Sequence, residues 1–227
     1  MRKSTGSICA ALILGLFVPT LAEAAGSRPA PTPTPEPEVQ TPEQEAKDAY
    51  NQGLKHRDKA WGYEDKAKVA ASDSERAKLL EKASKQYRKA IPLFEKATEI
   101  VPSFHQAFSS LGYAYRKSGE HEKALEAYDT ALDLAPLYGE AIEYRGQAYL
   151  GLNRIDDAKQ AYMQLFTSNR ELAGQLMEAM KQWLEQRQTD PAGVSQSEID
   201  DFATWVQERS ELAGQTAQLT HAATTTW

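Results

Sequence analysis

The chain has 227 residues, of which 26% are charged and 41% hydrophobic, and its formal net charge is −6 at pH 7. These values are ordinary for one soluble domain with tails, and the negative charge argues against a general nucleic-acid-binding protein. The charge is uneven, because residues 43–100 carry 13 Lys and Arg against 11 Asp and Glu, whereas residues 101–227 carry 10 against 18.

Residues 1–24 have the pattern of a secretory signal peptide. Two basic residues near the start precede an 11-residue apolar run over 8–18, and Ala22-Glu23-Ala24 reads as a cleavage site. Eleven apolar residues are too few to cross a bilayer, which needs roughly 20. We therefore expect cleavage after Ala24, no stable membrane span in the mature protein, and a periplasmic or secreted location.

Residues 25–42 read as a Pro-rich linker, which we expect to be extended and semi-rigid because proline fixes the backbone angle φ. The folded part is expected from residue 43. Thr41 can cap the first helix and Pro42 suits its first position. This helix is expected to run to about Trp61, or alternatively to Ala70.

A second long helix follows residues 72–75, Ser-Asp-Ser-Glu, which form a capping box. Its apolar residues recur at three- and four-residue spacing up to Ala97, and Pro92 lies within it, where we expect a kink. One side carries a stripe of lysines at the same spacing: Lys78, Lys82, Lys85 and Lys89. The stripe is either a solvated face or a contact surface for an acidic partner or an anionic surface.

The stretch 103–136 recurs at a shift of 34 residues as 137–170. Four positions recur in order: Gly112, Tyr115, Ala124 and Tyr128 become Gly146, Tyr149, Ala158 and Tyr162. This period, with small residues between aromatic ones, resembles the tetratricopeptide repeat family, here an exported bacterial member. The resemblance implies an all-α fold, a short right-handed α-solenoid of tetratricopeptide-type helical hairpins with an extended first hairpin and C-terminal capping helices.

The repeat at 103–136 matches the family pattern best. We expect its helices to cross closely at Gly112 and Ala124, beside Tyr128, and Ser103 and Gln106 to cap its first helix. In the repeat at 137–170, Arg145 stands where leucine is expected. A buried arginine is costly unless it is paired, so we expect a partly polar repeat interface there.

Residues 43–102 read as a first repeat whose halves are pulled apart. The step from Gly53 to Ala90 is 37 residues, against 12 from Gly112 to Ala124, so about 25 residues are inserted. The insertion should lengthen both helices into an arm.

The C-terminal part, 171–214, reads as two capping helices separated by a turn at 189–193. A capping box at 168–171 should open the first, and a box at 197–200 the second. The second should end near Gly214, and residues 215–227 are expected to be a disordered tail.

The family resemblance also implies which residues line the concave surface: Gln106, Ser109, Tyr113, Arg116, Lys117, Glu140, Glu143 and Gln147. They do not match the lysines and asparagines with which some family members clamp a C-terminal carboxylate. They favour an extended peptide or a helix of another envelope protein. The alternative is a concave surface that is solvated or filled by the chain's own helices.

No motif for catalysis or for a cofactor is recognised. The four histidines have no metal-ligand spacing, there is no G-x-S-x-G or phosphate-binding loop, and Cys9 lies in the expected signal peptide. We expect a non-catalytic scaffold for protein–protein interaction, without cofactor or metal. The alternative is a structural protein whose Lys-rich arm self-associates or docks on an anionic surface, and the oligomeric state is left open.

Overall fold

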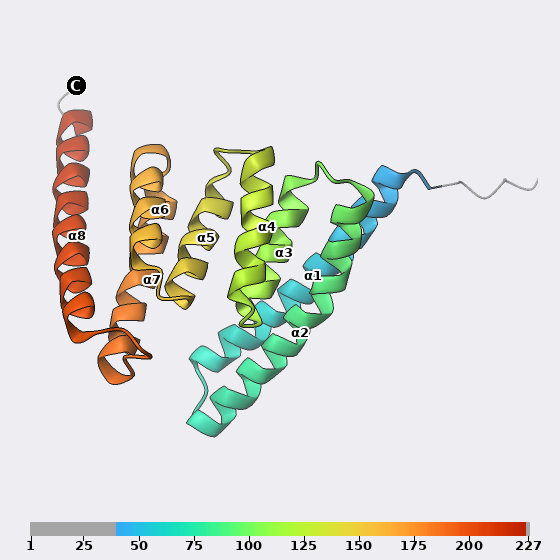
Figure 1. Cartoon of the computed structure of the whole chain (residues 1–227), viewed down its shortest axis with the longest axis horizontal. Coiled ribbons are helices and arrows are strands. Elements are labelled where there is room, and N and C mark those ends of the chain that lie inside the picture. The colour runs from blue at the N-terminus through green and yellow to red at the C-terminus, as the bar shows by residue number, and fades with distance from the viewer. Residues whose placement is uncertain (1–39, 226–227) are drawn as a thin grey trace, which may run out of the picture. The chain divides into compact units, whose positions relative to one another are not determined.

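The computed structural model describes residues 40–225, so the expected signal peptide and most of the Pro-rich linker lie outside the described part. Within it there are eight α-helices and no strand (Figure 1). They are α1 (Pro42–Lys68), α2 (Asp73–Ile100), α3 (His105–Lys117), α4 (His121–Leu134), α5 (Gly139–Gly151), α6 (Ile155–Ser168), α7 (Arg170–Thr189) and α8 (Gln196–Thr225).

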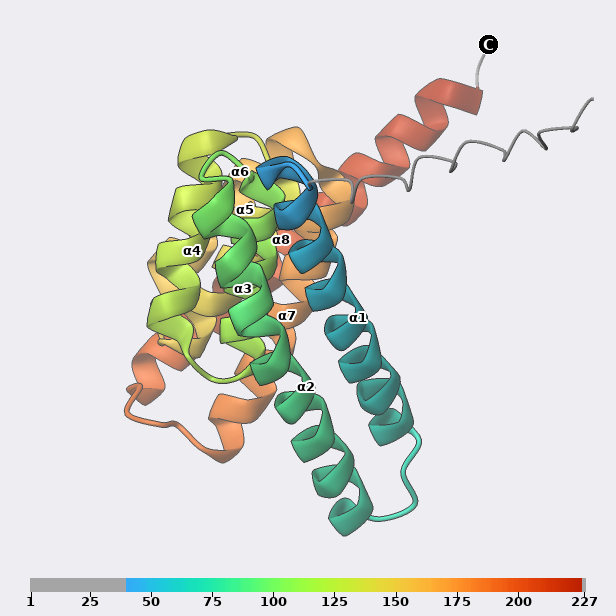
Figure 2. The ribbon, with the colours of Figure 1, turned by 90° about the vertical axis from the view of Figure 1, so that its right-hand side faces the viewer.

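The helices form consecutive antiparallel hairpins, each packed on the next. Helix α1 pairs with α2, α3 with α4, and α5 with α6, while α7 packs against both helices of the third hairpin. The first helices of successive hairpins are also neighbours, since α3 contacts α5 and α5 contacts α7. In Figures 1 and 2 the α1–α2 hairpin is visibly longer than the others. The expected all-α stack of hairpins with an extended first hairpin and C-terminal helices is confirmed.

The long hairpin begins as the capping residues predict. The Thr41 hydroxyl accepts a hydrogen bond from the Gln44 amide, and Ser72 accepts one from the Glu75 amide. Helix α1 runs to Lys68, which supports the longer of the two expected ends, and α2 continues through Pro92 to Ile100. Each helix has one buried face, which is rich in alanine on α1.

Three predicted helix caps are wrong. Helix α3 has Phe104 at its N-cap and no side-chain cap, so Ser103 and Gln106 do not cap it. The Phe104 ring packs against Tyr50 with centroids 4.8 Å apart, so this position serves packing instead. Helix α7 is capped by Asn169, one residue after the predicted Ser168. Helix α8 is capped by Ser195, whose hydroxyl accepts from the Glu198 amide, two residues before the predicted box.

Glycine permits the close crossing of helices in the first two hairpins. A Cβ placed on Gly112 would lie 2.7 Å from the ring of Tyr128, which is fully buried. A Cβ on Gly53 would lie 2.5 Å from the ring of Phe94. The correspondence between the split first repeat and the regular one therefore extends to the packing itself. At Gly146, in the third hairpin, the nearest atoms belong instead to Leu176 of α7.

The last helix is longer than predicted. We expected an end near Gly214 and a disordered tail, but α8 continues to Thr225, and that expectation is wrong for 215–225. Gly214 has open space around it and the residues after it include no proline. A single glycine costs a helix only about 1 kcal/mol relative to alanine, which is too little to end it.

Candidate protein-binding surface

The predicted contact residues lie on two neighbouring helices. Helix α3 carries Gln106, Ser109, Tyr113, Arg116 and Lys117, and α5 carries Glu140, Glu143 and Gln147. Their accessibility differs widely. Ser109 and Glu143 are 3% and 0% exposed, Glu140 is exposed, and the rest are half-buried. We call the six accessible residues the α3/α5 surface.

A polar network joins the two helices beneath this surface. Arg116 donates a hydrogen bond to the Gln147 side-chain oxygen at 2.6 Å, and the Gln147 amide donates to Glu143. The Arg116 guanidinium also lies 5.1 Å and 5.6 Å from the ring centroids of Tyr113 and Tyr144. Cation–π contacts of this kind strengthen when they are shielded from water. Arg116 is therefore held from several sides, so its substitution would disturb packing as well as charge.

Glu143 is the most unusual member of the network, because it is a carboxylate with no exposed surface. Burial raises its pKa above the ordinary value, while the hydrogen bond from Gln147 and the charge of Arg116 act in the opposite direction. Within residues 40–225 its second oxygen, Oε2, has no hydrogen-bond partner. Burying an ionised group without full pairing is unfavourable, so Glu143 makes the third hairpin sensitive to pH.

The long first hairpin contacts one end of the α3/α5 surface. The Trp61 indole N–H donates to the Tyr113 hydroxyl at 2.8 Å, and Glu64 forms an ion pair with Lys117 at 2.7 Å. Tyr113 and Lys117 are thus engaged by the chain's own α1. At the other end, the Gln106 and Glu140 side chains make no hydrogen bond or ion pair within the described residues.

Two aromatic residues beside this surface were missed by sequence reasoning. Tyr144 packs edge-on against Tyr113 with centroids 4.9 Å apart, and Trp61 does so at 6.2 Å. Trp61 was not found because it belongs to the inserted segment, to which no repeat position corresponds. Tyr144 follows the predicted Glu143 directly, so its position in α5 was the only available signal.

Arg145, which stands in place of leucine, is accommodated by pairing. Its guanidinium donates to Asp129 of α4 at 2.7 Å and lies 5.8 Å from the ring centroid of Tyr149. The interface between the second and third hairpins is therefore partly polar, as the sequence predicted.

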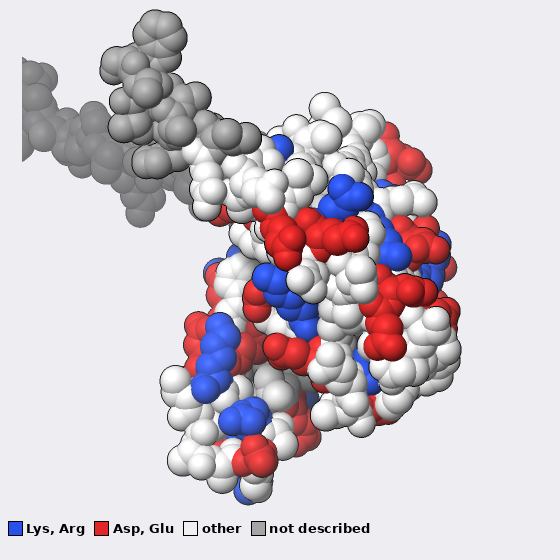
Figure 3. All heavy atoms as spheres, turned by 90° about the vertical axis from the view of Figure 1, so that its left-hand side faces the viewer, with Lys and Arg blue, Asp and Glu red and all other residues white. Residues whose placement is uncertain are grey.

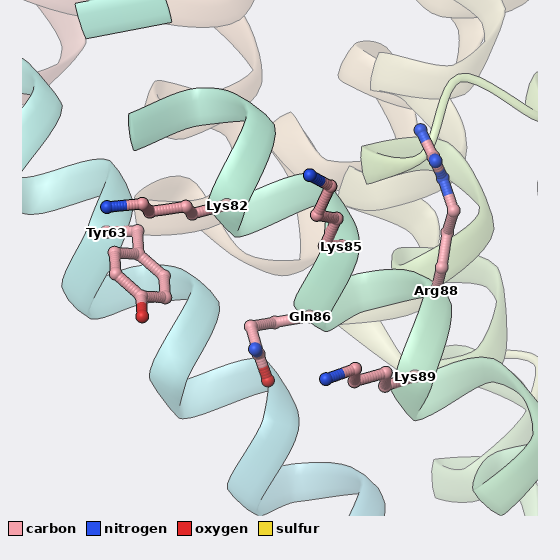
Figure 4. A pocket seen from close by; sticks show the side chains of 6 residues that line it. All are labelled: Tyr63, Lys82, Lys85, Gln86, Arg88 and Lys89. Carbon is pink, nitrogen blue, oxygen red and sulfur yellow. The ribbon is translucent and has the colours of Figure 1, made fainter. Parts of the chain in front are cut away.

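The lysine stripe of α2 lies on the surface, and Lys78, Lys82, Lys85 and Lys89 are all exposed. Three of them line a pocket of about 290 Å³ that Lys78 does not reach (Figure 4). The pocket is lined by Tyr63, Lys82, Lys85, Gln86, Arg88 and Lys89. The Lys82 ammonium lies 5.9 Å from the Tyr63 ring centroid.

Neither a metal-binding cluster nor a membrane-spanning helix is found among the described residues. No group of three or more His, Cys, Asp and Glu in residues 40–225 is arranged to hold a metal ion. No helix in this part of the chain combines the length and the apolar character that a membrane span requires.

Comparison with known proteins identifies the repeats. Family models described as tetratricopeptide repeat match residues 105–138 and 145–172. A search of curated proteins found no match.

Among solved structures, the chain is similar to the Sgt2 TPR domain from Aspergillus fumigatus, with 22% sequence identity and a TM-score of 0.42. The match covers 80% of this chain and 88% of that chain. It is also similar to MamA, with 20% identity, coverage of 72% and 96%, and a TM-score of 0.39. The first match covers the hairpin α3–α4, and the second runs from within α5 through α6 to the start of α7. Residues 105–172 therefore contain two tetratricopeptide repeats.

Proposed function

We propose that this protein is a non-catalytic, exported scaffold of the cell envelope that binds an extended peptide segment of another envelope protein along the α3/α5 surface. The observation that carries the proposal is the pair of unengaged polar side chains, Gln106 and Glu140, at corresponding positions of adjacent hairpins. Side-by-side helices with polar groups at matching positions suit an extended ligand that crosses both. The family's general role supports the same reading.

The envelope location rests on the signal-peptide pattern in residues 1–24. Expression of the full chain in a Gram-negative host, followed by fractionation and N-terminal sequencing, tests it directly. A mature protein that begins at Ala25 in the periplasmic fraction is the expected result. An uncleaved chain that remains in the cytoplasm would contradict the location.

The binding surface can be tested by site-specific photo-crosslinking in the native host. A photoreactive amino acid at Gln106 or Glu140 should capture the same partner, whereas one at Glu126, which is exposed on α4, should not. Gln106→Arg with Glu140→Arg should then reduce that capture, while Glu126→Arg with Asp133→Arg should leave it unchanged. Equal capture from both sets of positions would rule out the α3/α5 surface.

A further inference from the structure

The outer face of α2 is basic and has few partners of its own. Its four lysines lie opposite the buried face formed by Ala83, Tyr87 and Ala90. Only Lys85 has an acidic partner within the described residues, Glu81, at 2.7 Å and with both side chains exposed. Positive charges three or four residues apart on a helix repel one another, so this face favours a complementary negative surface. From Lys78 to Lys89 the stripe is roughly 16 Å long.

Helix α7 carries a matching acidic stripe. Glu171, Glu178 and Glu185 recur every seven residues, so they share one side of the helix, and all three are exposed. None forms an ion pair within residues 40–225, although Lys181 lies on a neighbouring part of the helix. The stripe is roughly 21 Å long, which is close to the length of the basic one.

The two stripes belong to different ends of the row of helices. Helix α2 packs against α1 and α3, whereas α7 packs against α5, α6 and α8. Figure 1 shows the same separation, with α3, α4 and α5 lying between α2 and α7. A contact between the stripes therefore requires two molecules.

We propose that the basic face of α2 docks on the acidic face of α7 in a second copy of the chain. Such a head-to-tail contact uses two different surfaces, so it leaves one of each free to extend into a row or to close into a ring. The pocket at Lys82, Lys85 and Lys89 supplies clustered donors for incoming carboxylates (Figure 4). The proposal concerns other surfaces than α3/α5 and does not depend on the proposed function.

Charge also distinguishes a second copy from an anionic membrane as the occupant. The whole chain has a net charge of −6, so an anionic membrane would repel most of the molecule. Figure 3 shows basic and acidic side chains interspersed over the face that it presents, with no broad patch of one sign. A stripe of opposite sign and similar length on the same chain is the more specific match for α2.

The proposal predicts a charge-swap result in sedimentation velocity of the mature chain. At about 20 mM ionic strength, where exposed charges are weakly screened, the wild type should sediment as oligomers that dissociate at about 500 mM. A variant with Lys82→Glu, Lys85→Glu and Lys89→Glu should sediment as a monomer, and so should one with Glu171→Lys, Glu178→Lys and Glu185→Lys. An equimolar mixture of the two variants should associate again, because each reversed stripe then meets a complement.

A matched control changes the net charge by the same amount as the α2 variant, but on helix α1. Lys47→Glu, Lys55→Glu and Lys59→Glu alter three exposed lysines of α1, and this variant should associate as the wild type does. Circular dichroism confirms that each variant is folded. A wild type that stays monomeric at low salt, or a mixture that fails to associate, would overturn the proposal. Sedimentation of a monomeric wild type with anionic lipid vesicles, lost in the α2 variant, would overturn it in favour of a membrane surface.

Discussion

The first and second hairpins share one helix crossing but differ greatly in length. In both, a glycine of the first helix lies against an aromatic ring of the second, Gly53 against Phe94 and Gly112 against Tyr128. Helices α1 and α2 are 27 and 28 residues long in total, against 13 and 14 for α3 and α4. This shared crossing, rather than helix length, is the basis for interpreting the first hairpin as a repeat with an insertion.

The two hairpins also differ in their cores. The second hairpin contributes Tyr128 to a large cluster that continues through α8. The distal part of the first is held by a small cluster of Ala60, Ala83 and Tyr87, with Tyr63 and Tyr113 partly buried beside it. Less apolar area is buried there, so we expect the distal arm to open more readily than the repeats. The extension also places Trp61 and Glu64 against α3, which no regular repeat would do.

The largest expected effect on stability comes from removing the aromatic ring at either helix crossing. Tyr128→Ala and Phe94→Ala should each lower the free energy of unfolding by about 3–5 kcal/mol, because each removes a buried ring and leaves a cavity. Chemical denaturation followed by circular dichroism measures both. Tyr128→Phe keeps the ring and serves as the control, with a much smaller change. A Phe94→Ala cost far below that of Tyr128→Ala would show that the two crossings are not equivalent.

Adding a side chain to the glycine of either helix crossing should have the next largest effect on stability. Gly53→Val and Gly112→Val place side-chain atoms where the rings already lie, so each should cost about 1–3 kcal/mol through overpacking. The same denaturation assay applies. If Gly53→Val is tolerated while Gly112→Val is not, the first hairpin lacks the close crossing.

The third hairpin adds a dependence on pH that comes from a buried carboxyl group. Burial raises the pKa of Glu143 above its value of 4.5 in the unfolded chain. The stability that the protonated Glu143 carboxyl contributes is therefore fully present below its pKa in the unfolded chain. This contribution is lost as the pH rises through the pKa of Glu143 in the folded chain. Glu143→Gln, which can still accept from Gln147, should be more stable than the wild type near neutral pH.

That difference should shrink as the pH falls towards 4.5, where the unfolded-state carboxyl also becomes protonated. Thermal unfolding of both proteins across this range measures it. Glu140→Gln, at an exposed position of the same helix, is the control and should not reproduce the pH-dependent gain. A constant difference between Glu143→Gln and the wild type at every pH would contradict the role of burial.

The smallest expected effect is a gain of stability in the arm. Gly62 lies within α1 with open space around it, unlike Gly53 nine residues earlier. Gly62→Ala should therefore raise the free energy of unfolding by about 0.5–1 kcal/mol, through lower backbone entropy in the unfolded chain. Denaturation of Gly62→Ala beside Gly53→Ala is the measurement. Destabilisation by Gly62→Ala would show that this part of the arm is packed more closely than we describe.

The sequence predicted most of the fold because repeats encode their own packing. Glycine and aromatic residues recur at fixed offsets, so the matching of Gly53 with Gly112 and the length of the insertion could be read directly. The residues at which helices begin were harder to predict from the sequence. Asn169 and Ser195 each lie within two residues of another plausible cap, and which residue caps depends on how the chain enters the stack. Local sequence does not contain that information.

The candidate surface was predicted only in part. The repeat register placed Gln106 and Glu140 at accessible positions, but it also selected Ser109 and Glu143, which neighbouring helices bury. Burial at a helix–helix contact depends on the side chains of both helices, and the inserted arm has no counterpart in the repeat pattern. Contacts made by Trp61 and Glu64 could therefore not be foreseen.

The most direct test of the account is to convert the first hairpin into a regular repeat. Residues 58–89 are replaced by residues 117–123, so the spacing from Gly53 to Ala90 becomes that from Gly112 to Ala124. Thermal unfolding is then followed by circular dichroism. We predict a helical chain with one cooperative transition, which Gly53→Val still destabilises by about 1–3 kcal/mol. A shortened chain without a cooperative transition would contradict the claim that the first hairpin is a repeat with an inserted arm.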